Sequence, residues 1–227
     1  MGQVRVGTSG WSYREWVGAF YPPRTTAARM LELYGRRFPT VEAHNTFRRR
    51  PRPETLARWR VEVPAGFRFA PKAHVAITHR QDLDGVGERV TAFFDGLAPL
   101  GDRLGPVLFQ LPHREPDLDR LDRLLSALPE APPAAFELGP AWHVPDVLER
   151  LDRRGAALVA VDADPEHVGA VGYVRLRRDG YTDADLDEWS ERLAAASRER
   201  DLYVFFKHDE AGDATRYASG VIERLAR

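Results

Sequence analysis

The sequence contains no cysteine among its 227 residues. Disulfide bonds, thiolate metal ligands and a thiol nucleophile are therefore excluded. It also lacks any apolar run approaching about 18 residues, the length that a membrane-spanning helix needs. The first residues show no apolar signal region. These absences lead us to expect a cytoplasmic protein without a membrane segment.

Lysine is almost as scarce as cysteine. Lys72 and Lys207 are the only lysines among 33 basic side chains, and all the others are arginines. A lysine that persists against such a bias can mark a position where the wide, permanently charged guanidinium does not suit the local chemistry. Survival by chance is the alternative, and the places of the two lysines in the fold decide between these interpretations.

Neither sign of charge dominates the chain. Lys and Arg number 33 and Asp and Glu 34, which gives a net charge of −1. This balance argues against a general nucleic-acid binder, although it leaves room for a local basic patch. Apolar residues make up 43% and charged residues 30%, as in an ordinary globular protein. The glycine-rich motifs G-x-G-x-x-G and the phosphate loop, which would indicate a nucleotide fold, are absent.

Short apolar segments alternate with amphipathic segments along the chain. Eight segments have the composition of strands: 5–8, 40–47, 67–73, 107–111, 134–138, 156–161, 173–176 and 202–206. Apolar residues at helical spacing follow most of them: 26–37, 54–59, 85–97, 118–128, 145–154, 183–196 (with Thr182 as N-cap) and 215–225.

This alternation predicts an α/β fold with a parallel sheet. Eight strands in a chain of this length predict a single domain, residues 1–227, folded as a (β/α)8 TIM-type barrel, which typically takes about 250 residues. An open doubly wound sheet is the alternative.

Polar side chains gather where the expected strands end. In barrels of this type the active site lies at the carboxyl ends of the strands. All seven histidines and both lysines lie at or just after such an end. The candidate site residues at these positions are Ser9, Glu42, His44, Lys72, Gln110, Glu137, Asp162, Arg175, Lys207, His208 and Asp209.

Glu42 and Glu137 are the candidates for acid and base catalysis. One carboxyl group in a dry pocket can keep its proton while another stays charged. Ion pairing with Arg175 or Lys72 is the structural alternative for both glutamates. Carboxylates and histidines of this set can also bind a divalent cation, but no spacing such as H-E-x-x-H supports a metal site. We therefore expect no metal and no other cofactor.

Lys72 completes the catalytic candidates. It can attack a carbonyl group as a Schiff-base amine. Binding of a phosphate or carboxylate group is the favoured role, because a lysine suits that task as well.

Three tryptophans, Trp11, Trp16 and Trp142, fall in loops after expected strands. There they can line a pocket and stack on a sugar ring or a base. They can equally form an apolar lid on the barrel. Trp59 and Trp189 lie in expected helices and are assigned to packing.

A set of short motifs runs through nearly the whole chain. It comprises G-T-S-G-W-S-Y at 7–13, T-V-E at 40–42, F-R-F-A at 67–70 with Lys72, I-T-H at 77–79, Q-L-P at 110–112, Glu137, Trp142 and Y-V-R at 173–175. This set resembles the pattern of domain-of-unknown-function family 72, the YecE-like proteins. The resemblance implies a TIM-type barrel and brings no established activity.

The chain departs from that pattern on the expected working face. His44 replaces the usual Asn, Arg48 replaces a Tyr, and Gly139-Pro140 stands where an Arg usually follows the glutamate. Lys207-His208 replaces a pair of Asn. The chain thus resembles a divergent member of the family, and a substrate of another member does not transfer to it without a test.

The leading hypothesis is a metal-independent barrel enzyme that acts on a small polar substrate, anionic or sugar-like. Glu42, Glu137 and Lys72 are its catalytic candidates, and the remaining residues named above are its substrate-binding candidates. One alternative is a divalent-metal isomerase or phosphodiesterase-like barrel. The other is a non-catalytic module that binds a ligand, a nucleic acid or a protein.

Overall fold

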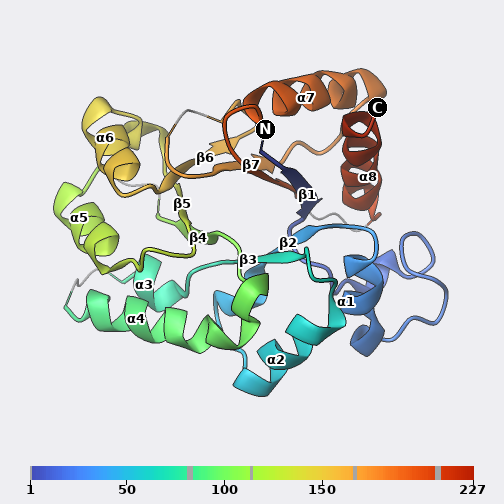
Figure 1. The fold of residues 1–227 in the computed structure, drawn as a ribbon, viewed down its shortest axis with the longest axis horizontal. Coiled ribbons are helices and arrows are strands. Elements are labelled where there is room, and N and C mark those ends of the chain that lie inside the picture. Colours follow the sequence, from blue (N-terminus) through green and yellow to red (C-terminus); the bar gives the residue numbers. More distant parts are fainter. Residues whose placement is uncertain (1, 81–83, 113–114, 166–167, 208–210) are drawn as a thin grey trace.

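A computed structural model describes residues 2–80, 84–112, 115–165, 168–207 and 211–227. Its parallel strands form a curved six-stranded sheet and a two-stranded sheet (Figure 1). The larger sheet has the order β1 (Val4–Thr8), β8 (Leu202–Phe206), β7 (Gly172–Leu176), β6 (Ala157–Val161), β5 (Ala134–Glu137) and β4 (Val107–Gln110). The smaller sheet pairs β2 (Thr40–Ala43) with β3 (Arg68–Pro71). The expected α/β fold with parallel strands is therefore confirmed.

Helices surround the strands in Figure 1. They are α1 (Ala27–Gly35), α2 (Pro53–Glu62), α3 (Val75–Thr78), α4 (Val86–Leu97), α5 (Leu118–Ala127), α6 (Pro145–Arg153), α7 (Asp183–Ala196) and α8 (Asp213–Leu225). Short 3-10 helices occur at η1 (Arg14–Trp16), η2 (His44–Thr46), η3 (Ala98–Arg103) and η4 (Pro140–Trp142). The expected cap at Thr182 is confirmed, because its side chain and that of Asp185 form a capping box. The short helix α3 was not expected.

The ladder is interrupted on both sides of the β2–β3 pair. Single parallel bridges join Ser9 to Glu42 on one side and Lys72 to Leu108 on the other. Between β1 and β2 the hydroxyl of Tyr34 accepts a hydrogen bond from the Thr8 amide (2.8 Å) and donates one to the Thr40 carbonyl (3.1 Å). The phenol thus takes the place of a direct hydrogen bond between the strands. A continuous eight-stranded ladder, as a full barrel would have, is not found among the described residues.

Alternation along the strands separates two layers of the core. Side chains on one face pack against the helices, and those on the other face form a second cluster that comes almost entirely from strands. The second cluster consists of Ala70, Leu108, Ala135, Ala157, Val159, Val171, Tyr173, Tyr203 and Phe205. Side chains two positions apart in a strand share a face. The polar residues two positions beyond four of these, at 72, 110, 137 and 175, therefore stand next to this apolar layer at the carboxyl ends of the strands.

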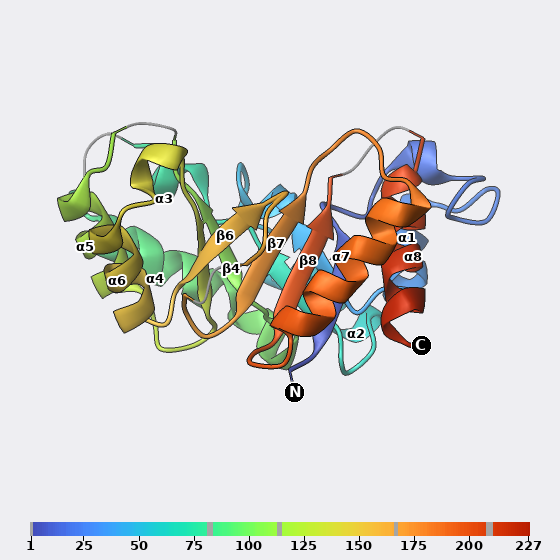
Figure 2. The ribbon, with the colours of Figure 1, turned by 90° about the horizontal axis from the view of Figure 1, so that it is seen from above.

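The strands β6, β7 and β8 run to the same edge of the molecule (Figure 2). The expected strand at 40–47 is shorter than predicted, since β2 ends at Ala43 and η2 begins at His44. That early end places Glu42 inside the strand and His44 just beyond it. No helix among the described residues is long and apolar enough to cross a membrane.

Candidate active site

Glu42 lies at the centre of the polar side chains on the inner face. Its side chain is completely buried and receives four hydrogen bonds. Arg175 Nη2 and Ser9 Oγ each donate to Oε1 at 2.9 Å, and the Tyr173 hydroxyl donates to Oε2 at 2.7 Å. His44 Nε2 contacts Oε1 as well. Because a carboxylate only accepts, this contact assigns the proton to Nε2 of His44.

Glu137 binds the other side of the same guanidinium. Arg175 Nη1 donates to Oε2 of Glu137, and Gln110 Nε2 donates to Oε1 at 2.7 Å. The amide oxygen of Gln110 accepts a hydrogen bond from Lys72 Nζ. The two glutamates, the arginine, the glutamine and the lysine thus form one connected chain of polar contacts.

The ionisation of Glu42 follows from this arrangement. Burial acts to raise the pKa of its carboxyl group, but the charges of Arg175 and His44 and the donated hydrogen bonds outweigh it and hold the pKa below its usual range. Burial and the negative charge of Glu42 raise the pKa of Tyr173 well above the ordinary tyrosine value. Glu42 is therefore an anion with its oxygens occupied, which suits holding Arg175 and His44 better than exchanging a proton with a substrate.

Two further cations lie near Arg175 without a carboxylate of their own. Burial and the positive charge of Arg175 lower the pKa of Lys72, and the same two causes lower the pKa of Arg177. Neither side chain has a carboxylate within ion-pair distance in the part of the chain that the structure describes. Glu42 and Glu137 both bind Arg175, so neither of these two carboxylates neutralises Lys72 or Arg177 directly.

Cavities flank the network on two sides. Glu137 and Arg177 help to line a cavity of about 650 Å³ beside β6, where Val161 is 41% exposed. His44 and Tyr13 help to line a smaller one of about 160 Å³. Burial and the charge of Glu42 raise the pKa of Tyr13 to about 12, so its hydroxyl stays protonated. The larger cavity has the size of a small-molecule site.

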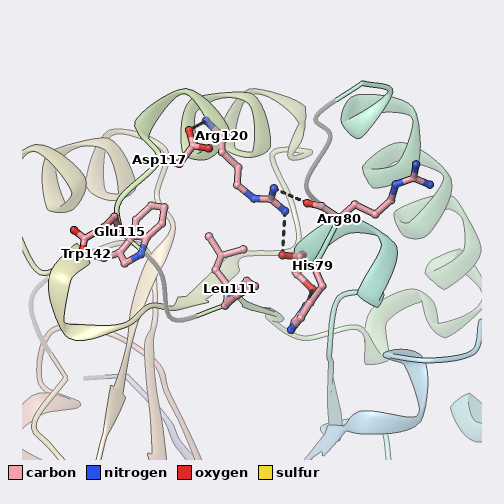
Figure 3. Close-up of a pocket in the computed structure, with 9 residues that line it drawn as sticks. His79, Arg80, Leu111, Glu115, Asp117, Arg120 and Trp142 are labelled. Atoms are coloured by element: carbon pink, nitrogen blue, oxygen red, sulfur yellow. Dashed lines mark hydrogen bonds between the residues drawn. The ribbon is translucent and has the colours of Figure 1, made fainter.

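A third cavity, of about 220 Å³, lies behind the end of β4. Figure 3 shows Trp142 and Leu111 in its wall, with Arg120 reaching across toward α3. Arg120 donates to the carbonyl oxygens of Thr78 (3.0 Å) and Arg80 (2.6 Å). Its guanidinium therefore links α5 to the end of α3. Trp142 is almost fully buried. It lines this third cavity and forms no part of the charged network around Arg175.

The other sequence-predicted residues have different surroundings. Trp11 packs edge-on against Trp59, with ring centroids 4.9 Å apart, and helps to line the small cavity beside His44. Asp162 accepts hydrogen bonds from the Arg177 amide (2.8 Å) and the Tyr181 hydroxyl (3.0 Å) and so positions the segment that carries Arg177. Lys207 is exposed and pairs with Asp179 at 3.1 Å. His208 and Asp209 lie outside the described residues.

Three residues that belong to this site, Tyr173, Arg177 and Phe47, were not predicted from the sequence. Tyr173 and Arg177 flank Arg175 at a spacing of two, and alternation along β7 would have assigned them to the same face. Phe47 carries Lys72 Nζ 4.2 Å above its ring centroid. No motif marks this contact, because it joins two loops. No group of three or more histidine, aspartate or glutamate side chains that could hold a metal occurs among the described residues.

The fold and the site define an α/β protein with a buried charge network where its parallel strands end. The family model "Protein of unknown function DUF72" matches residues 5–227, so the chain belongs to the DUF72 family. This confirms the resemblance that its motifs showed.

Relatives and solved structures agree with this assignment. The chain is 29% identical to UPF0759 protein YecE of Escherichia coli K12 over 72% of its own length and 61% of YecE, so it spans less than two thirds of that relative. It is 22% identical to UPF0759 protein YunF of Bacillus subtilis, over 98% of this chain and 94% of YunF.

Crystal structures of two DUF72 family proteins resemble the fold. The one from Thermotoga maritima has a TM-score of 0.80 at 22% identity and covers 99% of this chain and 100% of that one. The one from Enterococcus faecalis has a TM-score of 0.80 at 21% identity and covers 99% and 96%. At these identities the likeness concerns the fold alone.

Proposed function

We propose that this protein is a metal-independent enzyme for a small anionic or sugar-like substrate, bound where the strands end. The observation that carries the proposal is the pair of cations Lys72 and Arg177, which stand beside Arg175 with lowered pKa values. Placing unneutralised cations together in a partly buried site is unfavourable unless an anion offsets them. A bound carboxylate or phosphate group would relieve that cost.

Glu42 and Glu137 have different roles, because only Glu137 lines the larger cavity. Glu137 lines the cavity of about 650 Å³ together with Arg177 and can exchange a proton with a substrate there. Glu42 has no exposed surface and holds Arg175 and His44 in place. His44 is 34% exposed and lines the small cavity, where it serves as a substrate-binding group.

A run of arginines adds to the positive charge near the site. Arg48, Arg49, Arg50 and Arg52 follow His44 in the sequence, and their side chains are exposed. None of them makes an ion pair with another residue that the structure describes. Such a run attracts anions over about 10 Å at ordinary ionic strength.

We also propose that the eight strands close into one barrel and one domain. The bridges on both sides of the β2–β3 pair support this, since the Gly10 amide donates to Glu42 O (2.9 Å) and the Ala73 amide to Leu108 O (2.8 Å). Hydrogen exchange would test it. Protection of both amides equal to that of the strand interiors is expected, and rapid exchange at either position would contradict closure.

Titration calorimetry with inorganic phosphate, small carboxylates and sugar phosphates tests the binding site. Loss of one charge-assisted hydrogen bond in Arg177→Gln should weaken binding by roughly tenfold or more, equivalent to about 1.5–3 kcal/mol. Arg178→Gln is the matched control, because Arg178 already pairs with Asp185 at 2.6 Å on the outside. Absence of binding by every probe, or equal effects of the two variants, would contradict the proposal.

Catalysis needs a separate test. The anions that bind are incubated with the protein and followed by NMR, and Glu137→Gln should stop any conversion while binding persists. Conversion at the wild-type rate in Glu137→Gln would show that the acid–base assignment is wrong. Binding without any product over long incubation would instead establish the non-catalytic module.

A further inference from the structure

Lys72 has unusual surroundings for a lysine. Its ammonium group donates to the neutral amide oxygen of Gln110 and lies over the ring of Phe47. No carboxylate of the described residues lies within ion-pair distance of it. The side chain is half-buried where β3 ends.

Lys207 provides an internal comparison. Its side chain is 42% exposed and pairs with Asp179 at 3.1 Å. These are the only two lysines in the chain. Lys207 has a carboxylate partner, which stabilises an ammonium ion, whereas half-buried Lys72 has no carboxylate within ion-pair distance among the described residues.

Those surroundings lower the pKa of Lys72 and so raise the fraction of the amine that is neutral and nucleophilic. Burial removes the water that stabilises the charged form, and Arg175 repels it. An arginine cannot lose its proton in a protein, so the exchange of lysine for arginine that prevails elsewhere in the sequence would remove this property here.

We propose that the Lys72 amine forms an imine with an aldehyde or ketone that carries a carboxylate or phosphate group. This names the substrate class of the proposed site and rests on the proposed function. Arg177 would hold the anionic group, and Arg175 and Glu137 lie on the far side of Gln110 from the amine. A nucleophilic lysine of this kind is activated by loss of solvent and by a neighbouring cation.

The covalent step balances without another reactant. The ammonium group first releases one proton to water. The nitrogen lone pair then attacks the carbonyl carbon, a nitrogen proton passes to the carbonyl oxygen, and a carbinolamine results. The released proton returns to the hydroxyl group, which leaves as water, so that ammonium and carbonyl become a protonated imine and one water molecule.

Reductive trapping on the wild-type protein tests this step. Glyoxylate or pyruvate with cyanoborohydride converts an imine into a stable secondary amine, and peptide mapping by mass spectrometry distinguishes Lys72, Lys207 and the amino terminus. At about pH 7, Lys72 should be labelled severalfold faster than Lys207, because a lowered pKa raises the neutral fraction of the amine at Lys72. Equal labelling, or faster labelling of Lys207, would overturn the proposal.

Competition and variants separate this proposal from the anion site itself. Inorganic phosphate should slow labelling of Lys72 and leave Lys207 unaffected. Lys72→Arg should keep phosphate binding and lose the adduct, whereas Lys207→Arg should keep both. Phosphate binding without labelling of Lys72 would overturn the imine and leave the binding site standing. Rapid labelling of Lys72 that phosphate does not slow would support the reactive amine and count against the anion site.

Discussion

Arg175 Nη2 lies 2.9 Å from Glu42 Oε1, although 133 positions separate the two residues in the chain. Both side chains are buried, with 2% and 0% of their surface exposed. The same guanidinium also contacts Glu137, so one arginine joins β2, β5 and β7 at the edge where the strands end. The charged network therefore links the carboxyl ends of three strands, and it is also the candidate active site.

Glu42→Gln should destabilise the fold. The substitution keeps the shape of the side chain but removes the charge that balances a buried guanidinium, and breaking such a pair costs about 3–5 kcal/mol. Because Arg175 keeps its contact with Glu137, we expect a value near the lower limit, measured as the free energy of unfolding in urea. Asp179→Asn is the control, since it removes an exposed pair with Lys207 worth about 0–1 kcal/mol. A loss no greater than that of the control would show that the buried pair contributes little.

The stability that Glu42 contributes should disappear in acid. Its folded-state pKa lies below the ordinary glutamate value of about 4.3, so the contribution is complete above that pH and is lost as the pH falls toward the depressed value. Wild type should therefore exceed Glu42→Gln in urea midpoint at about pH 7, and the gap should narrow below about pH 4. A gap that stays constant from neutral to acid pH would mean that the carboxylate is not the source of the difference.

The sequence predicted which residues lie at the strand ends better than it predicted which side chains contact one another there. Glu42 and His44 were both predicted to lie where the second strand ends, and the two side chains do touch. The sequence does not distinguish exposed Lys207 from half-buried Lys72, because each lysine directly follows a strand. Trp11 likewise has the sequence setting of a pocket residue, but its contact with Trp59 depends on how α2 packs.

The insertion of Tyr34 between β1 and β2 was beyond sequence reasoning for a related reason. Its helical spacing places it correctly on the buried face of α1, yet its hydroxyl bonds Thr8 in a strand 26 positions away. Local patterns specify which face of an element is apolar. They do not specify which distant backbone group a buried hydroxyl meets.

Tyr34→Phe should lower the stability of the fold. The change leaves the Thr8 amide and the Thr40 carbonyl without their buried partner, and an unsatisfied buried group costs about 1–3 kcal/mol. We expect a loss of stability in that range in urea unfolding, with faster hydrogen exchange of the Thr8 amide. Tyr203→Phe is a matched control, because the hydroxyl of Tyr203 makes no hydrogen bond with the described residues. Equal stability of the two variants would indicate that the strands can pair directly when the hydroxyl is removed.

The arginine run after His44 should act at a distance on anion binding. Replacing Arg48, Arg49 and Arg50 by glutamine removes three exposed charges that pair with no described residue. Binding of phosphate at low ionic strength should weaken severalfold, because the field of these charges concentrates anions near the site. At about 0.15 M salt the screening length falls to about 8 Å, so the difference from wild type should shrink.

Calorimetry at low and high salt distinguishes this long-range effect from direct contact. If the triple variant binds more weakly by the same factor at both salt concentrations, the arginines touch the ligand and belong to the site itself. Arg29→Gln, which removes an exposed charge that lies 3.6 Å from Glu32 on α1, should leave binding unchanged at either concentration.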